Sequence, residues 1–437
     1  MGNERRVVIT GMGLVSPLGN TPEALWDALS TGRSGVGPLS LDSRQTLPVQ
    51  FGSEARQFTG HIDDFGPMEK DQKKSVRKGL KMMCRECQMG VAAALLALGN
   101  AGLKPGGADP ERSGILFGVD YMLSVPEDFS EGMVRCRDEA EGFQFSRWGV
   151  EGLPKMEPLW LLKYLPNMPA SHLAIYCDFR GPNNSLTMRE AAAGAAVGEA
   201  REIIRRGDAD LMVVGGTGTR LHPMKMGHAI GQEQLALGDG DPTAMSRPFD
   251  RDRNGMVLGE GAGAIVIEEL QAAQKRGATI LGEVLAAATS CVAERRLLAR
   301  RDRALQNVLE AVLRSADVSP GSVGHVHAHG LSTRTCDADE SRAIQAVFGK
   351  RSTPAPVVAA KSHFGNLGAG SGMIELVASV LALRHGRLFP VLNYATPDPE
   401  CPVAVVRDGD VPAGDSFVKL SVTPQAQASA VLVRRWQ

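Results

Sequence analysis

The chain has 437 residues, of which 43% are hydrophobic, and its 48 basic and 49 acidic side chains give a formal net charge of −1. This length is sufficient for two domains or one large duplicated unit with a substantial buried core. The near balance of charge argues against nucleic acid or another polyanion as the main partner. No window approaches the roughly 18 apolar residues of a membrane span. The polar start, MGNERR, lacks the character of a signal peptide, so we expect a soluble protein.

The seven cysteines are scattered without a disulfide framework. Cys84 and Cys87 form one Cys-x-x-Cys in an otherwise helical stretch, and no second pair completes a zinc site. We therefore expect buried thiols, no metal, no cofactor and a reducing cytoplasmic location.

Short apolar segments that end in glycine alternate with alanine-rich helical segments along the chain. This pattern is typical of an α/β protein with buried, mainly parallel sheets. A polar region from about 120 to 169, which contains methionine and proline, interrupts the first half without a clean pattern. The expected strands are 6–10, 114–119, 211–215 and 264–268 in the first half, and 280–287, 325–329, 357–360 and 430–434 in the second.

The segment 181–190 reads GPNNSLTMRE and is followed by an alanine- and glycine-rich run. We predict a turn, a helix from about Thr187 to Arg206, and a buried strand from Leu211 to Gly215. Thr187 and Glu190 also have the spacing of a capping box, in which Glu190 would bind amide groups at the start of the helix. That structural interpretation stays open beside any functional one.

Five further stretches have a fixed order along the chain. They are RRVVITGMGLVSPLG at 5–19, PFDRDRNGMVLGEGAG at 248–263, AHG at 328–330 with Thr333, Asp337 and Glu340, KS at 361–362 with Gly365 and LGA at 367–369, and LNY at 392–394 with PDP at 397–399. This order resembles the β-ketoacyl-acyl-carrier-protein synthases over nearly the whole chain. The resemblance implies a thiolase-like five-layered αβαβα fold built from two duplicated halves, 1–270 and 271–437.

The resemblance also implies what the region from 120 to 169 does. Insertions at that position in relatives help to form the dimer interface and the acyl pocket. We therefore expect Tyr121, Met122 and Trp160 to take part in them, and a dimer built mainly through edge strands of the first half.

In active relatives a cysteine thiolate takes the acyl group from the carrier, and two histidines assist decarboxylation of the malonyl unit. When the spacing of that motif is applied from Asn183, Glu190 falls at the position of the cysteine. His329 stands at the first histidine position and Asn366 at the second. An asparagine amide can donate a hydrogen bond to a thioester oxygen. A carboxylate, by contrast, is a weak nucleophile toward a thioester, and the anhydride it would form is labile.

Two more positions match polar residues that orient the site in relatives. Lys361 and Glu340 are assigned to this role, although either could equally form a structural ion pair. The resemblance places Leu331 where a small polar residue faces the phosphopantetheine arm, and it assigns Leu331 and Thr333 to substrate binding.

The glycine-rich loop that supplies part of the oxyanion hole in relatives is replaced by VTPQAQ at 422–427. Pro424 has no amide hydrogen, so the donor geometry cannot be the same. We assign Thr423 in this segment to substrate binding.

Other histidines and cysteines near these motifs have simpler interpretations. His325 and His327 alternate with His329 on one strand and are expected to be packed residues. The spacing turns His363 away from the pocket, and Cys177 is expected to be a buried thiol and not a replacement nucleophile.

Three functions are consistent with these residues. The first is a non-elongating homologue, similar to a chain-length factor of fatty acid or polyketide synthesis, which binds acyl carrier protein as a homodimer or as a heterodimer with an active ketosynthase. The second is an atypical decarboxylase, hydrolase or condensing acyltransferase with Glu190 as base and His329 as acid. The third is a scaffold without ligand, which an apolar tunnel beside His329 would exclude. If Glu190 is buried near His329, we expect the pKa of both groups to be raised.

Overall fold

The computed structural model describes residues 5–40, 47–104, 106–296 and 298–437. Met1 to Glu4, the first part of the segment judged too polar for a signal peptide, lie outside the described residues. An 11-stranded sheet runs through the described part of the chain. Its order is β13 (Ala404–Val405), β12 (Pro356–Val358), β11 (His325–His327), β14 (Ser416–Val422), β15 (Gln427–Arg434), β10 (Gly282–Cys291), β1 (Val7–Val15), β9 (Glu260–Glu269), β8 (Leu211–Thr219), β4 (Ser113–Val119) and β7 (Asn183–Thr187).

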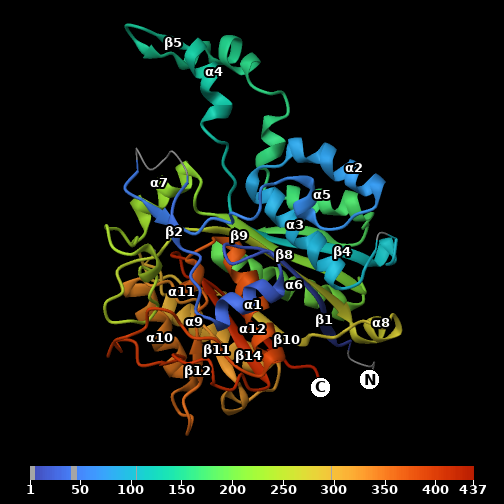
Figure 1. The fold of residues 1–437 in the computed structure, drawn as a ribbon, viewed down its shortest axis with the longest axis vertical. Coiled ribbons are helices and arrows are strands. Elements are labelled where there is room, and N and C mark those ends of the chain that lie inside the picture. Colours follow the sequence, from blue (N-terminus) through green and yellow to red (C-terminus); the bar gives the residue numbers. More distant parts are fainter. Residues whose placement is uncertain (1–4, 41–46, 105, 297) are drawn as a thin grey trace.

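The helices divide this sheet into two packed parts and give five layers (Figure 1). Helices α3 (Arg85–Asn100) and α5 (Met168–Cys177) cover the part that contains β1, β9, β8, β4 and β7. Helices α6 (Ala192–Arg206) and α12 (Ala369–His385) lie between the two parts, and α9 (Arg301–Ser315) and α10 (Arg334–Phe348) lie on the far side. The fold is therefore the expected αβαβα arrangement.

Shorter elements complete the described chain. They are α1 (Pro22–Ser30), α2 (Lys70–Gly79), α4 (Glu127–Arg135), α7 (Pro223–Gln232), α8 (Leu270–Lys275), α11 (Lys361–Phe364), β2 (Gly37–Pro38), β3 (Phe51–Gly52), β5 (Arg137–Asp138) and β6 (Gly142–Phe143). Helix α8 begins at the residue where the two halves were expected to meet, but the division at 270 stays a prediction. None of the helices in the described residues is both long and apolar enough to cross a membrane.

The expectation of mainly parallel sheets is wrong for the inner strands. β4 is parallel to β7 and β8, and β11, β12, β13 and β14 pair in parallel. β1, β9, β10 and β15, by contrast, join both of their neighbours in antiparallel ladders, as β8 does with β9 and β14 does with β15. A short connection such as the one between β14 and β15 permits only antiparallel pairing. A continuous apolar run indicates that both faces of a strand are buried. Parallel and antiparallel strands can both be buried in this way, so the run does not give the strand direction.

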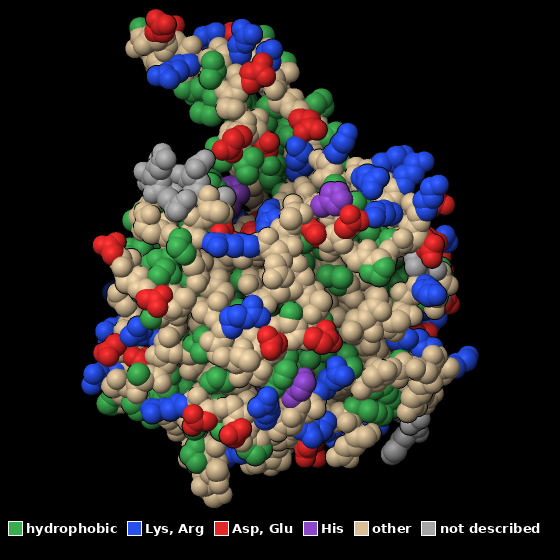
Figure 2. Space-filling view, viewed as in Figure 1, with side chains coloured by type: hydrophobic (Ala, Val, Ile, Leu, Met, Phe, Trp, Pro, Cys, Tyr) green, Lys and Arg blue, Asp and Glu red, His purple; other side chains and the backbone are tan. Residues whose placement is uncertain are grey.

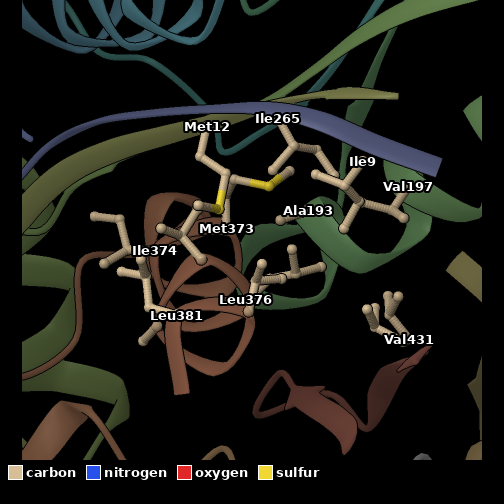
Figure 3. Close-up of a cluster of buried hydrophobic side chains, with 14 of the residues drawn as sticks. Ile9, Met12, Ala193, Val197, Ile265, Met373, Ile374, Leu376, Leu381 and Val431 are labelled. Atoms are coloured by element: carbon tan, nitrogen blue, oxygen red, sulfur yellow. The ribbon is translucent and has the colours of Figure 1, made fainter. Parts of the chain in front are cut away.

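The core of the central layer explains the composition of α12. Residues 369–383 of this helix are all buried because sheet lies on both of its sides, and a helix in that position must be apolar all round. Figure 3 shows Met373, Ile374 and Leu376 of α12 beneath Met12 of β1 and Ile265 of β9.

The predicted helix from Thr187 to Arg206 is wrong at its start. Asn183–Thr187 is the strand β7, a 3-10 turn covers Arg189–Ala191, and α6 begins only at Ala192. Parallel pairing with β4 binds the backbone of β7, and a φ of 50° at Arg189 breaks the path between strand and helix. The residue before the turn is Met188, with no side-chain capping bond, so the Thr187 capping box does not form.

The region from 120 to 169 contains an arm that projects from the body (Figure 1). It carries α4, the β5–β6 hairpin and several short turns. Hydrophobic side chains gather on its surface (Figure 2), and those exposed are Met133, Val134, Phe143, Phe145, Val150, Leu153, Leu159, Leu161 and Leu162. Unlike these, Met122 is buried in the core beside α3, and Trp160 packs against the same core.

Candidate functional site

His329 stands directly after β11 and is almost completely buried. The backbone amides of His329 and Gly330 donate to the two carboxylate oxygens of Glu340 on α10, at 2.6 and 2.8 Å. Burial raises the pKa of Glu340 to about 7. Glu340 therefore positions the backbone of the histidine loop, and its carboxylate binds these two amides and not the imidazole.

The imidazole of His329 contacts Lys361 instead. Lys361 Nζ lies 3.3 Å from His329 Nδ1 and donates to the His329 carbonyl at 2.9 Å. It also forms a buried ion pair with Glu375, whose other oxygen lies 3.0 Å from Lys419 Nζ. Lys361 is thus in an ion pair, but with Glu375 and not with Glu340.

Burial, followed by the charge of Lys361, holds the pKa of His329 well below its usual value. The charge of Glu190 does act to raise this pKa, but burial and the Lys361 ammonium outweigh it, so the expected net increase is wrong. The imidazole is neutral, and Nδ1 accepts from Lys361, which leaves the hydrogen on Nε2.

Glu190 lies in the 3-10 turn before α6, with 2% of its surface exposed. Its Oε1 forms a buried ion pair with Arg220 and accepts from Asn366 Nδ2 at 3.1 Å. Its Oε2 lies 3.5 Å from Arg189 Nε. The side chain therefore faces across the chain toward Arg220 and Asn366, and not toward helix amides as the capping interpretation required.

Two further carboxylates extend this cluster. Arg220 Nη1 lies 3.4 Å from Asp120 Oδ2, and Arg189 Nη2 donates to Glu233 Oε1 at 2.6 Å. Burial would raise the pKa of Glu190, but the charges of Arg220 and Arg189 outweigh it and hold that pKa below its ordinary value. The expected increase is wrong for this reason, and Glu190 is a carboxylate at neutral pH.

The side-chain amide of Asn366 forms its hydrogen bonds within this part of the protein. Its Nδ2 donates to Glu190 and lies 3.4 Å from Met256 Sδ, and its Oδ1 accepts from Gly368 at 3.0 Å. The donor that the sequence assigned to a thioester oxygen is therefore directed at Glu190.

A cavity of about 100 Å³ lies beside these groups. Leu331, Thr333 and Thr423 line it, and their assignment to substrate binding stays a prediction, whereas Asn366, Lys361 and Glu340 lie behind the lining. The full lining is Glu190, Gln232, Glu233, Gln234, Arg301, His329, Leu331, Thr333, Thr335, Cys336, Val422, Thr423 and Pro424. Most of the lining residues have polar side chains, and the cavity is small beside the ~300–1,000 Å³ of ordinary ligand pockets. It is not the apolar tunnel that would exclude a scaffold.

Comparison with known proteins gives one consistent result. Residues 4–273 match the N-terminal domain of β-ketoacyl synthases, and residues 281–395 match their C-terminal domain. The chain belongs to the β-ketoacyl synthase family. It is 32% identical to 3-oxoacyl-[acyl-carrier-protein] synthase 2 of Synechocystis sp., over 91% of this chain and 90% of the relative. The protein of the same name from Coxiella burnetii is also 32% identical, with the same shares covered.

Solved structures of this family match the whole chain. One is a type II polyketide synthase acyl carrier protein in complex with its ketosynthase bound to the hexaketide, with a TM-score of 0.84, 25% identity and 100% of both chains covered. Another is the ishigamide ketosynthase/chain length factor, with a TM-score of 0.83, 25% identity and 100% of both chains covered.

The remaining candidates of this β-ketoacyl synthase homologue lie away from the cavity. His325 contacts the Ala413 carbonyl and Ser379, and His327 contacts Ser379, so both are packed residues. Tyr121 is half-buried, over the ammonium of a buried lysine. Neither Tyr121 nor Trp160 is among the cavity-lining residues.

His363 and Cys177 are also as expected. The ring nitrogens of His363 contact the carbonyls of Arg33 and Pro390. Burial raises the pKa of Cys177 to about 12, as expected for an inert thiol. In the described parts of the chain, no three His, Cys, Asp or Glu side chains gather as a metal site would require.

Sequence reasoning missed the charged partners of both Glu190 and Lys361. Two signals were present for the first. Arg189 precedes Glu190, and Arg220 follows directly after a buried apolar strand, where an arginine is rare unless it is paired. Lys419 sits within the apolar strand β14 and gave a similar signal.

Proposed function

We propose that this chain is a non-elongating member of the β-ketoacyl synthase family that pairs with an active ketosynthase, in the manner of a chain-length factor of fatty acid or polyketide synthesis. The observation that carries this proposal is the state of Glu190. The family's nucleophile position holds an ionised carboxylate that is bound by Arg220 and has taken the amide of Asn366. A stable acyl-enzyme requires both a better nucleophile and free donors for the oxyanion.

We infer that the cavity beside His329 receives the phosphopantetheine end of an acyl carrier protein. Thr333 and Thr423 line it with hydroxyl groups, and the Nε2 hydrogen of His329 is a donor for a thioester or amide oxygen. An acyl carrier protein stands with its ketosynthase in one matched structure, which supports the same class of partner for this chain.

Two surfaces support a dimer, as the sequence suggested. β7 is the last strand at one edge of the sheet, and its residues are exposed or half-buried. An open edge presents unpaired backbone groups that pair readily with another strand. The projecting arm exposes many large apolar side chains, which is typical of a protein–protein contact. We expect an active ketosynthase with an intact Cys-His-His set to cover both.

The second candidate, in which Glu190 is a catalytic base, has less support. A general base works best with a pKa near the working pH, and the arginines hold the pKa of Glu190 below its ordinary range. The ionised carboxylate would also repel the carboxylate of a malonyl group.

The test is reconstitution with a candidate active ketosynthase, its acyl carrier protein, and malonyl and acyl donors. We expect a stable complex whose product chain length depends on this chain, and no acyl adduct on this chain by intact-protein mass spectrometry. An adduct on the wild-type chain would contradict the proposal. A complex with an unchanged product profile would favour the scaffold.

A second assay separates the enzymatic alternative. Malonyl decarboxylation is measured for the wild type alone, for Glu190→Gln and for His329→Ala. The proposal requires no turnover in any of the three, whereas a carboxylate base requires turnover in the wild type and its loss in Glu190→Gln.

A further inference from the structure

Arg220 lies between two cavities of very different size. Its sequence neighbours Thr219 and Leu221 both line a cavity of about 740 Å³, together with Phe58, Val125 and His222. The side chain of Arg220 itself faces the other way, toward Glu190, which lines the cavity of about 100 Å³ beside His329. Arg220 is in the bend directly after β8 and lines neither cavity, so its side chain lies between two residues that line the larger cavity and one that lines the smaller.

Three elements hold the guanidinium in place. Arg220 follows β8, Asp120 follows β4, and both lie against the segment that leads into α12. A Cβ atom added to Gly368 would come within 3.5 Å of Arg220 Nε and 3.9 Å of Asp120 Oδ2. Gly368 has a φ of 62°, so the backbone there both permits and requires a residue without a side chain. The Glu190–Arg220–Asp120 row therefore lies directly against backbone.

We propose that Arg220 is a specificity-determining residue that closes the passage between the two cavities. It holds the Glu190 carboxylate against Asn366, and the row of buried charges blocks the way from the pocket beside His329 to the larger cavity. A carrier-bound thiol or short acyl group can then reach His329, whereas a long linear acyl chain cannot extend through this subunit. This inference rests on the proposed function, in which that pocket receives a phosphopantetheine-linked group.

A purely structural ion pair explains less of what is observed. Arg220 Nε is buried without a hydrogen bond to any of the described residues, and Glu190 Oε2 and Asp120 Oδ2 are held only by long ion-pair contacts, 3.5 Å to Arg189 and 3.4 Å to Arg220. Buried polar atoms that serve stability alone are almost always satisfied. A buried ion pair is also weak evidence for stability, because desolvation offsets the attraction between the charges.

The experiment measures how the length of an acyl group affects its transfer to a thiol placed at the floor of the pocket. Glu190→Cys supplies the thiol, and Arg220→Ala is added to open the passage. Arg189→Ala in the same background is the matched control, because Arg189 also lies beside position 190 but its neighbours do not line the larger cavity. Acetyl and octanoyl thioesters of N-acetylcysteamine are the probes, and intact-protein mass spectrometry gives the rates.

We expect Glu190→Cys alone to accept acetyl over octanoyl by roughly tenfold or more, as a pocket that excludes several methylenes would. Adding Arg220→Ala should bring the ratio of rates close to one, and adding Arg189→Ala should leave it unchanged. The inference is overturned if Arg220→Ala does not change the ratio, or if the single variant already accepts both groups equally.

A further variant and a second pair of probes cover the cases in which the first measurement fails. Asp120→Asn combined with Glu190→Cys and Arg220→Ala removes the unpaired charge of Asp120 while leaving the passage open, and it is read in the same way if the variant that keeps Asp120 fails to fold. Methyl and octyl methanethiosulfonates give the same ratio by disulfide formation if the thiol does not react with thioesters. The ratio bears on Arg220 alone, whereas an acyl adduct on the wild type would contradict the proposed function.

Discussion

The two walls of the pocket beside His329 have opposite electrostatic designs. On the wall from the second half, Lys361 and burial hold His329 neutral. On the wall from the first half, Arg220 and Arg189 hold Glu190 ionised. The wall from the second half therefore presents a neutral imidazole. The wall from the first half presents a buried carboxylate that two arginines stabilise.

This difference indicates that Glu190 is part of a coordinated set of residues. A lone buried carboxylate would be strongly unfavourable. Here two arginines and an amide surround it, and Asp120 and Glu233 complete the cluster. The wall from the first half is thus built around the Glu190 carboxylate, which fits the proposed subunit that does not form an acyl-enzyme.

The largest expected effect comes from breaking the charged wall at its centre. Arg220→Ala leaves Glu190 and Asp120 buried without their cation, and removal of one partner of a buried pair costs about 3–5 kcal/mol. The shift in the urea unfolding midpoint measures this loss. Arg220→Met with Glu190→Gln is the control. It should recover much of the stability because it leaves fewer buried charges without a partner. A loss below about 1 kcal/mol in the single variant would contradict this account of the wall.

A smaller effect is expected when only the charge of Glu190 is removed. Glu190→Gln keeps the shape but weakens the bonds to Arg220, and hydrogen bonds to charged groups contribute about 1.5–3 kcal/mol. We expect a loss of about 2 kcal/mol at pH 7, measured by urea unfolding.

The pH dependence of that difference follows from the sign of the pKa shift. The folded pKa of Glu190 lies below its ordinary value, and an unfolded glutamate titrates near ~4.3. The stabilisation is therefore fully present above the unfolded pKa and is lost as the pH falls below it. The wild type and Glu190→Gln should converge as the pH is lowered from 6 toward 3. A difference that grows in acid would mean that the pKa is raised and not lowered.

The comparison of the two walls also tells how far the sequence could predict the site. The motif spacing predicted that His329, Lys361 and Glu340 lie close together. Such a prediction is possible because each motif is local, and its hydrogen bonds form within a few residues or to the next helix. The alternation of apolar segments indicated an α/β protein, and the resemblance to the family implied the αβαβα arrangement. The sequence could not assign the pKa direction of Glu190, which depends on Arg220, 30 residues away in sequence.

The remaining errors have a similar cause. The sequence at Thr187 favours a capping box locally, but the pairing of β7 with β4 places Thr187 in a strand instead. Strand direction was missed because burial on both faces is compatible with either direction. Pattern reasoning is therefore reliable where the determining contacts are local, and it fails where they come from distant strands.

On the wall from the second half, which carries His329, a modest effect is expected at the start of α10. Thr333 is the N-cap of this helix, and its Oγ1 accepts from the Cys336 amide at 3.3 Å. Thr333→Ala should therefore cost about 1 kcal/mol of stability. Thr333→Ser keeps the hydroxyl and should recover most of it in the same urea titration. Equal losses in both variants would mean that methyl packing in the cavity, and not capping, is what Thr333 contributes.

The smallest effect is expected at Thr187, which has the capping pattern in sequence but not in the structure. Thr187 ends the strand β7, is exposed, and is followed by Met188 with no side-chain capping bond. Thr187→Ala should change the free energy of unfolding by less than about 0.5 kcal/mol, as surface changes usually do. Thr21 is the matched control, because its side chain accepts from the Ala24 amide at 3.1 Å at the start of α1, so Thr21→Ala should cost about 1 kcal/mol. A loss at Thr187 as large as that at Thr21 would restore the capping box and make Glu190 a residue of the helix start.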